Sequence, residues 1–172
     1  MTNFTIAVAA SADVPELNQL VNSAYRGDSS RQGWTTEADL LDGQRTSEAD
    51  LLDLLSKPAG QILTYRVGGK LLGCVYLEQT GKKGYLGMLT VAPDVQTAGI
   101  GKRLLAEAEA VGRAAGCQTI TMTVLTQRHE LIAWYERRGY QSTGVTKPFP
   151  DDPRFGLPKQ PLTFVFLSKS LV

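Results

Sequence analysis

The 172-residue chain contains little cysteine and almost no histidine. Its two cysteines, Cys74 and Cys117, lie in or beside apolar runs, so we expect buried, reduced thiols rather than a disulfide or a metal pair. His129 is the sole histidine, which excludes most zinc arrangements and any relay that needs two imidazoles. We therefore expect no metal in this protein.

An excess of charge of one sign is also lacking, and so are long hydrophobic runs. Lys plus Arg number 18 and Asp plus Glu number 17, a balance that argues against nucleic acid as a partner. No basic region precedes the short N-terminal apolar run, which Asp13 interrupts, and no apolar run is long enough to span a bilayer. These features predict a cytoplasmic protein without a membrane partner, and the length predicts one domain over residues 1–172.

The apolar periodicities predict a mixed α/β order. Strands are expected at Phe4–Ala9, Gln61–Val67, Leu71–Leu77, Tyr85–Val91, Thr119–Leu125, Tyr140–Val145 and Leu162–Leu167. Helices are expected after Asp13, at Glu37–Leu41, at Glu48–Leu55, from Ile100 and at Glu130–Arg138, with Asp13 and Ser47 as candidate N-caps. The apolar final strand favours a dimer edge, and hence a homodimer.

The most informative stretch is Leu89–Arg113, where a strand gives way to a helix. Between the two stands Gln96-Thr97-Ala98-Gly99-Ile100-Gly101, and apolar residues recur at helical spacing from Ile100 onward. Glycines let a ligand approach the backbone, and the first N–H groups of a helix have no internal partners. With Lys102 in the first turn, the stretch predicts a site for a phosphate or pyrophosphate.

Two common phosphate-binding motifs do not fit this stretch. A Walker loop needs a glycine where Gln96 stands and a serine or threonine where Arg103 stands. The dinucleotide fingerprint needs a third glycine where Leu104 stands. On these residues alone, a glycine-containing turn without any ligand stays an alternative.

The stretch resembles the acetyl-CoA motif of the GNAT acyltransferase superfamily, Gln/Arg-x-x-Gly-x-Gly/Ala, through Gln96, Gly99 and Gly101. Residues Trp134–Tyr140 resemble the family's aromatic-Tyr-Glu-Lys/Arg-x-Gly-Phe/Tyr signature. The resemblance implies an α/β fold of the GNAT type: a mixed, mainly antiparallel sheet of about seven strands, about four flanking helices, and a splay between strands 4 and 5. It also implies an acetyl-CoA-dependent N-acetyltransferase, with acetyl-CoA as co-substrate.

The resemblance also implies which residues would bind the co-substrate. The pyrophosphate would lie on backbone amides between Thr97 and Lys102, and the pantetheine arm would run along the strand that ends at Val91. The implied cofactor residues are Leu89, Thr90, Val91, Gln96, Thr97, Ala98, Gly99, Ile100, Gly101 and Lys102. Arg128 stands where relatives commonly carry an asparagine that contacts the arm, so its longer, charged side chain would reach a phosphate or an anionic substrate instead.

Tyr135 stands where the family places its general acid, and a phenol with a reference pKa of about 10 can protonate a departing thiolate. The general base is less determined, because the strand Tyr85–Val91 contains no carboxylate. Glu78, Glu37, or water reached through either of them are candidates, and an amine deprotonated before binding needs no dedicated base.

The polar segment Tyr25–Thr36 predicts acceptor contacts through Tyr25, Trp34 and the following Glu37, with a plain surface loop as the alternative. The reaction expected is acetyl transfer to a primary amine of a small molecule or amino-acid-like acceptor, by direct attack in a ternary complex. Two alternatives stay open: an acetyl-CoA sensor without turnover, and a protein N-terminal or lysine acetyltransferase. The proline-rich loop Lys147–Pro161 would narrow the acceptor cleft and favours a small molecule.

Overall fold

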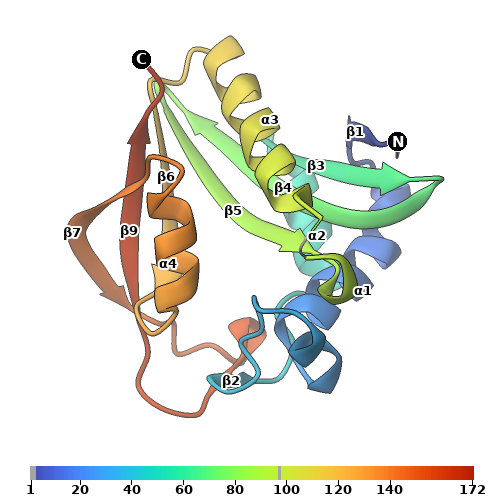
Figure 1. Ribbon diagram of the computed structural model, residues 1–172, viewed down its shortest axis with the longest axis vertical. Helices are drawn as coiled ribbons and strands as arrows, with labels where there is room; N and C mark the ends of the chain where they lie inside the picture. The colour runs from blue at the N-terminus through green and yellow to red at the C-terminus, as the bar shows by residue number, and fades with distance from the viewer. Residues whose placement is uncertain (1–2, 97) are drawn as a thin grey trace.

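A computed structural model describes residues 3–96 and 98–172 (Figure 1). The strands are β1 (Thr5–Val8), β2 (Leu41–Asp42), β3 (Gly60–Val67), β4 (Lys70–Thr80), β5 (Lys83–Val91), β6 (Thr119–Leu125), β7 (Gln141–Pro148), β8 (Leu157–Pro158) and β9 (Thr163–Ser170). The α-helices are α1 (Val14–Tyr25), α2 (Glu48–Ser56), α3 (Ile100–Ala114) and α4 (His129–Glu136). Short 3-10 turns are formed by Ser11–Asp13, Asp28–Gln32, Pro93–Val95 and Pro153–Phe155.

Seven strands form one sheet in the order β1-β3-β4-β5-β6-β9-β7, and β2 and β8 form a separate short pair. All neighbours in the large sheet are antiparallel except β5 and β6, which are parallel. Pairing between β5 and β6 runs from Lys83–Thr119 to Tyr85–Thr121 and then stops. Beyond that point the two strands diverge and leave a V-shaped opening in the sheet (Figure 1). This arrangement confirms the expected fold, with β5 and β6 as the fourth and fifth strands of the GNAT order.

The helices cover both faces of the sheet (Figure 1). On one face α3 and α4 pack over the strands, and on the other face α1 and α2 do. The apolar side of α3 buries Leu104, Leu105 and Ala108, while Lys102 and Glu107 are exposed. Gly73 of β4 permits this close packing, because a Cβ there would lie 2.8 Å from Leu104 Cδ1. The two helix layers therefore fix β5 and the start of α3 relative to each other.

Two local predictions are wrong. Glu37–Leu41 forms a turn rather than a helix: the amides of Leu40 and Leu41 both donate to the Glu37 carbonyl, and the chain then enters β2. The reason is tertiary, since Leu41 is buried and pairs with Pro158, more than a hundred residues away. Asp13 does not cap α1, because its carboxylate accepts from the Ala10 amide and pairs with Arg66 instead. The Ser47 cap of α2 is confirmed, at 3.1 Å to the Asp50 amide.

The final strand is not an edge of the sheet, so it cannot be the dimer edge that its apolar pattern favours. β9 lies between β6 and β7, and its backbone pairs with both of these strands. The edge strands of this sheet are β1 and β7, and every residue of β7 is exposed. A homodimer stays a prediction that no contact between chains tests.

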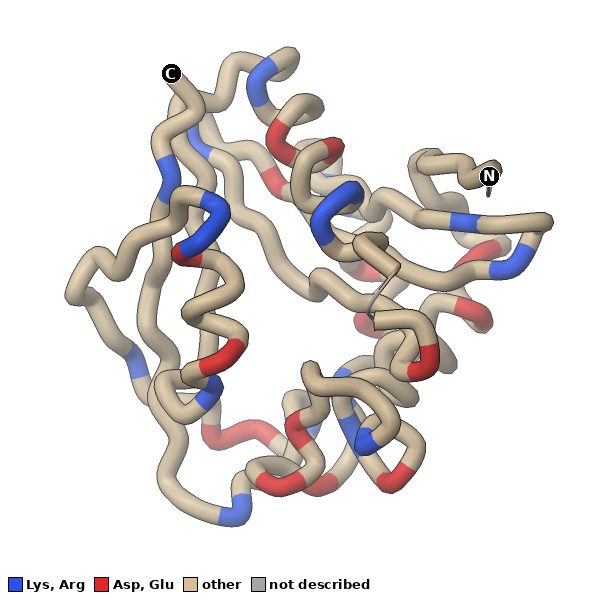
Figure 2. Tube along the Cα trace, viewed as in Figure 1, with Lys and Arg blue, Asp and Glu red and all other residues tan. Residues whose placement is uncertain are grey.

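Charged residues of both signs are spread along the chain trace (Figure 2). This distribution agrees with the net charge of +1. Among the described residues, no helix combines the length and the apolarity that crossing a bilayer requires.

Candidate active site

The backbone of β5 is distorted where it leaves β6. Met88 has a φ of 55°, and the register between β4 and β5 shifts between Cys74 and Tyr76. Such a bulge re-aims backbone groups, and a left-handed methionine requires support from its surroundings. That support is visible: Thr90 Oγ1 donates to the Met88 carbonyl at 2.9 Å, and the Tyr25 hydroxyl donates to the Leu89 carbonyl. From Leu86 onward, the side of β5 that faces β6 has no strand partner.

The turn after β5 ends at Gly99, the N-cap of α3. Gly99 has a φ of 78°, a left-handed conformation that favours glycine, and no described side chain caps the helix. No described residue accepts a hydrogen bond from the amides of Ile100, Gly101 or Lys102. Amides at the positive end of a 15-residue helix suit an anion, and the anion site that the sequence predicts falls at this helix start.

A first cavity of about 220 Å³ lies against this helix start. Its lining residues are Tyr25, Trp34, Thr35, Leu89, Val91, Gln96, Gly99, Gly101, Lys102, Leu131, Trp134, Tyr135 and Arg138. Trp34 and Trp134 are 6.4 Å apart between ring centroids and come from the loop after α1 and from α4. The cavity therefore combines the positive end of a helix with an aromatic pair, which suits a ligand with a phosphate end and an apolar arm.

Arg138 is a lining residue that the sequence analysis did not assign. Its guanidinium lies 3.8 Å from the Trp134 ring centroid, and its Nη1 donates to the Trp134 carbonyl at 2.8 Å. Burial, and then the neighbouring Arg137, lower the pKa of Arg138. With Lys102 it supplies a second cation to the first cavity. The signal for it was the doubled arginine in the second GNAT-like motif.

Gln96 lines the first cavity and also makes hydrogen bonds that connect two segments of the chain. Its amide nitrogen donates to Thr35 Oγ1 at 2.5 Å and to the Val91 carbonyl at 3.0 Å, and its oxygen accepts from the Thr35 amide at 3.2 Å. A Cβ on Gly33 would clash with the Gln96 amide group, so a larger residue there would displace this side chain. Gln96 therefore joins the loop after α1 to the turn before α3.

Tyr135 lies where the two cavities of the site meet. A second cavity of about 390 Å³ fills the opening between β5 and β6, and the two cavities share Tyr25, Leu89, Leu131 and Tyr135. The Tyr135 ring stands edge-on to Trp134, with 5.1 Å between centroids. No described residue bonds its hydroxyl, and burial raises its pKa above the ordinary value. The phenol therefore stays protonated and free to donate.

The second cavity is lined by charged and aromatic side chains. The charged members are Arg26, Glu37, Arg45, Arg128 and Lys147. The aromatic members are Tyr25, Tyr85, Tyr135, Phe149, Phe155, Phe164 and Phe166. The loop after β7 supplies Phe149 and Phe155, so the proline-rich segment does border this cavity, as expected.

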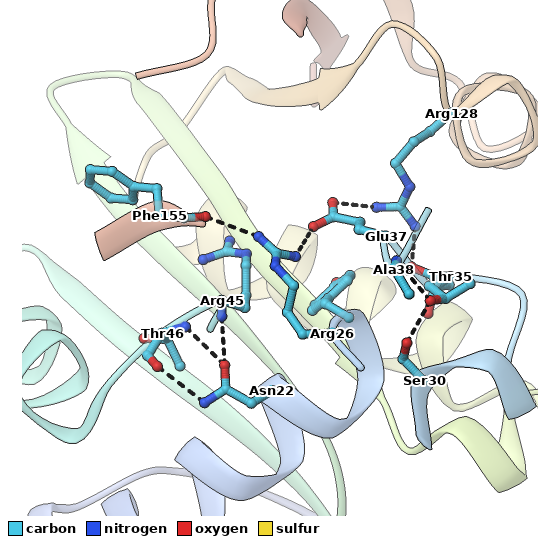
Figure 3. Close-up of polar contacts among 12 residues, drawn as sticks. Asn22, Arg26, Ser30, Thr35, Glu37, Ala38, Arg45, Thr46, Arg128 and Phe155 are labelled. Carbon is cyan, nitrogen blue, oxygen red and sulfur yellow. Dashed lines mark hydrogen bonds and ion pairs between the residues drawn. The ribbon is translucent and has the colours of Figure 1, made fainter. Parts of the chain in front are cut away.

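Glu37 is held between two arginines (Figure 3). Arg26 Nη1 donates to its Oε1, and Arg128 Nη1 donates to its Oε2 at 3.0 Å. All three side chains are no more than 10% exposed. Arg26 also donates to the Phe155 carbonyl at 3.0 Å, and Arg128 donates to the Thr35 carbonyl. This cluster, the Arg26–Glu37–Arg128 clamp, ties α1, α4 and two loops together around the second cavity.

The structure brings most of the predicted site residues together. Leu89, Val91, Gln96, Gly99, Gly101, Lys102, Trp34, Tyr25 and Tyr135 line the first cavity, and Glu37 and Arg128 line the second. The side chains of Thr90, Ala98 and Ile100 line neither cavity: Thr90 bonds within β5, and Ile100 is buried in the core. Thr97 lies outside the described residues. Trp34 lies with the cofactor candidates rather than with the acceptor candidates.

Glu78 is not brought to the site. It lies at the end of β4, where it accepts from the Tyr76 hydroxyl at 2.8 Å and pairs with Lys57 at 3.3 Å. Its hydrogen bond with Tyr76, followed by Lys57, lowers its pKa despite partial burial. A carboxylate so occupied, and outside the lining of both cavities, is badly placed to accept a proton from a bound amine.

The substitution Gly101→Ala is expected to weaken ligand binding without weakening the fold. The new Cβ would lie 3.5 Å from Val91 and 3.6 Å from Trp134, ordinary contacts to two residues that line the first cavity. It would thus occupy ligand space, and we expect about a tenfold higher Kd for coenzyme A. Calorimetry measures this, with thermal unfolding as the stability readout.

Gly112→Ala is the matched control for this prediction. Gly112 lies in the same helix, its added Cβ would keep 3.4 Å or more from its neighbours, and it borders neither cavity. Equal Kd values for Gly101→Ala, Gly112→Ala and the parent protein would show that the ligand does not approach the helix start.

Known proteins resemble this chain in sequence and in fold. It is 31% identical over 116 residues to an IAA acetyltransferase from Azospirillum brasilense, covering 65% of this chain and 76% of that protein. It is 36% identical over 103 residues to an amino-acid acetyltransferase from Ralstonia nicotianae, covering 59% of this chain but only 22% of that longer protein.

Solved structures agree on the fold. The ribosomal-protein-S18-alanine N-acetyltransferase of Escherichia coli superposes with a TM-score of 0.73 at 16% identity, over 98% of this chain and 94% of that one. The PaiA N-acetyltransferase of Thermoplasma acidophilum, solved in complex with coenzyme A, gives 0.71 at 18% identity, over 98% and 99%. Residues 16–140 match the acetyltransferase (GNAT) family, so this chain belongs to the GNAT family of acetyl-CoA-dependent N-acetyltransferases.

Proposed function

We propose that this protein transfers the acetyl group of acetyl-CoA to the primary amine of a small-molecule or amino-acid-like acceptor, by direct attack in a ternary complex. The observation that carries the proposal is the meeting of two cavities at Tyr25, Leu89, Leu131 and Tyr135. One cavity has the open helix start and the other has the charged and aromatic lining. Two ligands bound in them would touch at this junction, which is what a direct transfer requires.

The first cavity suits the co-substrate. The amides of Ile100, Gly101 and Lys102 would bind its pyrophosphate, with the Lys102 and Arg138 charges beside them. The unpaired side of β5 around Leu89 would bind the pantetheine arm through backbone hydrogen bonds. When bound, acetyl-CoA supplies an activated acetyl thioester at the junction of the cavities.

Tyr135 would act as general acid toward the departing thiolate. Its hydroxyl lies at the junction without a described partner, and its raised pKa keeps it protonated at neutral pH. A backbone N–H near Leu89 or Thr90 would donate to the thioester carbonyl as negative charge develops on it. Such a preorganised donor typically lowers the barrier by about 3 kcal/mol.

The described side chains favour direct attack over an acyl-enzyme. Both cysteines are buried and neither lines a cavity, and burial raises the pKa of Cys74 to about 12. A thiol of that kind is a poor nucleophile. Two free cysteines also support a reducing, cytoplasmic location as part of the proposal.

No carboxylate in the lining is free to serve as general base. Glu37 is the one carboxylate among the described lining residues, and the clamp engages both of its oxygens. We therefore propose that the amine enters in its neutral form or loses its proton to water, without a dedicated protein base. The rate should then rise with pH until the free amine predominates.

The test of the proposal is acetylation of a panel of amines and amino acids, followed by the release of free coenzyme A thiol. We expect turnover with intersecting initial-rate lines, as a ternary complex requires, rather than the parallel lines of a ping-pong mechanism. Tight coenzyme A binding without turnover of any amine would instead indicate a sensor. Turnover only on peptide N-termini or lysines would indicate a protein acetyltransferase.

A further inference from the structure

The second cavity has an excess of positive charge. Its described lining contains four cationic side chains, Arg26, Arg45, Arg128 and Lys147, and one carboxylate, Glu37. Arg26 and Arg128 both bind that carboxylate. No ion pair or hydrogen bond joins the Arg45 guanidinium or Lys147 Nζ to any described residue. Two cations facing a partly closed cavity are thus left without a counter-charge from the described chain.

The backbone at Arg45 is held in place. Asn22 of α1 accepts from the Arg45 amide at 2.6 Å and from the Thr46 amide at 3.1 Å, and its own amide nitrogen donates to the Thr46 carbonyl at 3.1 Å. Figure 3 shows the Arg45 side chain extending from this anchored segment in the same direction as Arg26. The guanidinium carbon lies 5.8 Å from the centroid of the Tyr25 ring. The backbone from which the Arg45 side chain extends is therefore anchored by α1.

The guanidinium groups also repel one another. Burial lowers the pKa of Arg26 first, and the charges of Arg45 and Arg128 lower it further against the favourable pull of Glu37. An added anion near Arg45 would relieve this repulsion and gain charge-assisted hydrogen bonds. The electrostatics of the second cavity thus favour a negatively charged ligand.

The rest of the lining is apolar and aromatic. Phe149 and Phe164 stack with 5.4 Å between ring centroids, and Phe166 and Tyr85 continue this surface along β9 and β5. The Phe155 carbonyl is held by Arg26, which keeps this part of the proline-rich loop at the cavity. An apolar side chain on the ligand would lie against this wall while its charged group meets Arg45.

We propose that Arg45, with Lys147 at the rim, binds the carboxylate of an amino-acid acceptor whose side chain is apolar or aromatic. The proposal rests on the proposed function, because it assigns the substrate class of that same site. The Tyr25 ring contacts Arg45, and its hydroxyl bonds the Leu89 carbonyl at the cavity junction. A carboxylate at Arg45 would thus place the amine of a small molecule toward the point of transfer.

The test compares each apolar amino acid with the amine that lacks only its carboxylate, such as L-phenylalanine with phenethylamine and L-leucine with isoamylamine. We expect kcat/KM to favour the amino acid, and Arg45→Met to reduce that preference by about 10- to 100-fold. Arg45→Lys should restore part of it, since a lysine keeps the charge but not the fork of donors. Arg31→Met is the matched control, because Arg31 is exposed, pairs with Asp39 and borders neither cavity.

The possible failures are distinguishable. Equal kcat/KM values for each amino acid and its matching amine in the parent protein would overturn the inference and leave the proposed function standing. This comparison uses the parent protein alone, so it does not depend on a variant that folds. An unchanged preference in a folded Arg45→Met protein overturns the role of Arg45. Acetylation of none of the amino acids or amines overturns the proposed function and the inference with it.

Discussion

Tyr135→Phe is expected to lower kcat by about 100-fold or more, while the Kd for coenzyme A stays within about twofold of the parent value. The variant removes one hydroxyl that no described residue bonds, so neither a hydrogen bond nor packing volume is lost from the fold. What is lost is the hydroxyl that we propose as the proton donor at the junction of the two cavities. Steady-state kinetics with a saturating acceptor measures the effect, and calorimetry measures coenzyme A binding.

The pH dependence adds a second readout for Tyr135. The acid must be protonated to act, and burial raises its pKa above the ordinary value of about 10. Ionisation of this phenol should therefore produce no fall in kcat between pH 7 and about pH 10. A loss of kcat centred near pH 8 would show that another group is the acid.

Tyr65→Phe is the matched control for the same chemistry. Tyr65 is buried in the core, borders neither cavity, and bonds Arg103 through its hydroxyl at 3.0 Å. Its variant is expected to change stability slightly and kcat hardly at all. An equal fall in kcat for both variants would mean that the loss of a buried tyrosine hydroxyl in general, and not proton donation by Tyr135, lowers kcat.

Glu37→Gln is expected to reduce the free energy of unfolding by about 3–5 kcal/mol, because it removes the charge that two buried arginines share. Glutamine keeps the size of the side chain but leaves Arg26 and Arg128 without a counter-ion. The affected contacts reach Thr35 and Phe155, so acetyl transfer should fall as well. Urea unfolding followed by circular dichroism measures the stability change.

Asp39→Asn controls for removing a carboxylate from an exposed ion pair in the same loop. Asp39 pairs with Arg31 at 2.7 Å on the surface, where such pairs contribute about 0–1 kcal/mol. Similar effects of the two substitutions would mean that the Arg26–Glu37–Arg128 clamp is not a stabilising centre. A stable Glu37→Gln protein with higher activity would instead mean that Glu37 restrains the acceptor loop.

Local patterns in the sequence predicted much of the fold and several residues that line the first cavity. Gln96, Gly99 and Gly101 lie in one short segment that follows β5 and ends in the first turn of α3, so the conformation that they predict depends only on residues that are neighbours in the chain. The helical periodicity from Ile100 and the alternation in Thr119–Leu125 are likewise local, and the structure contains both elements. The failure at Glu37–Leu41 has the opposite cause, because pairing with β8 overrides the local helical preference.

The partners of charged side chains were beyond the reach of the sequence. Glu78 and Glu37 were both candidates for a base, yet Glu37 meets Arg128 from 91 residues away while Glu78 meets Lys57 outside both cavities. No motif surrounds Arg45 in the sequence. Its place in the lining of the second cavity, with no ion-pair partner among the described residues, comes from the packing of distant segments.

The sequence by itself determined the strand-to-helix turn before Ile100 and the position of Tyr135, since each lies in a short motif whose geometry its immediate neighbours dictate. Only the tertiary structure decided which charges are paired within the protein and which line the second cavity without an ion-pair partner among the described residues. The physical reason is that ion pairing depends on distance and burial, and these arise when segments far apart in the chain pack together.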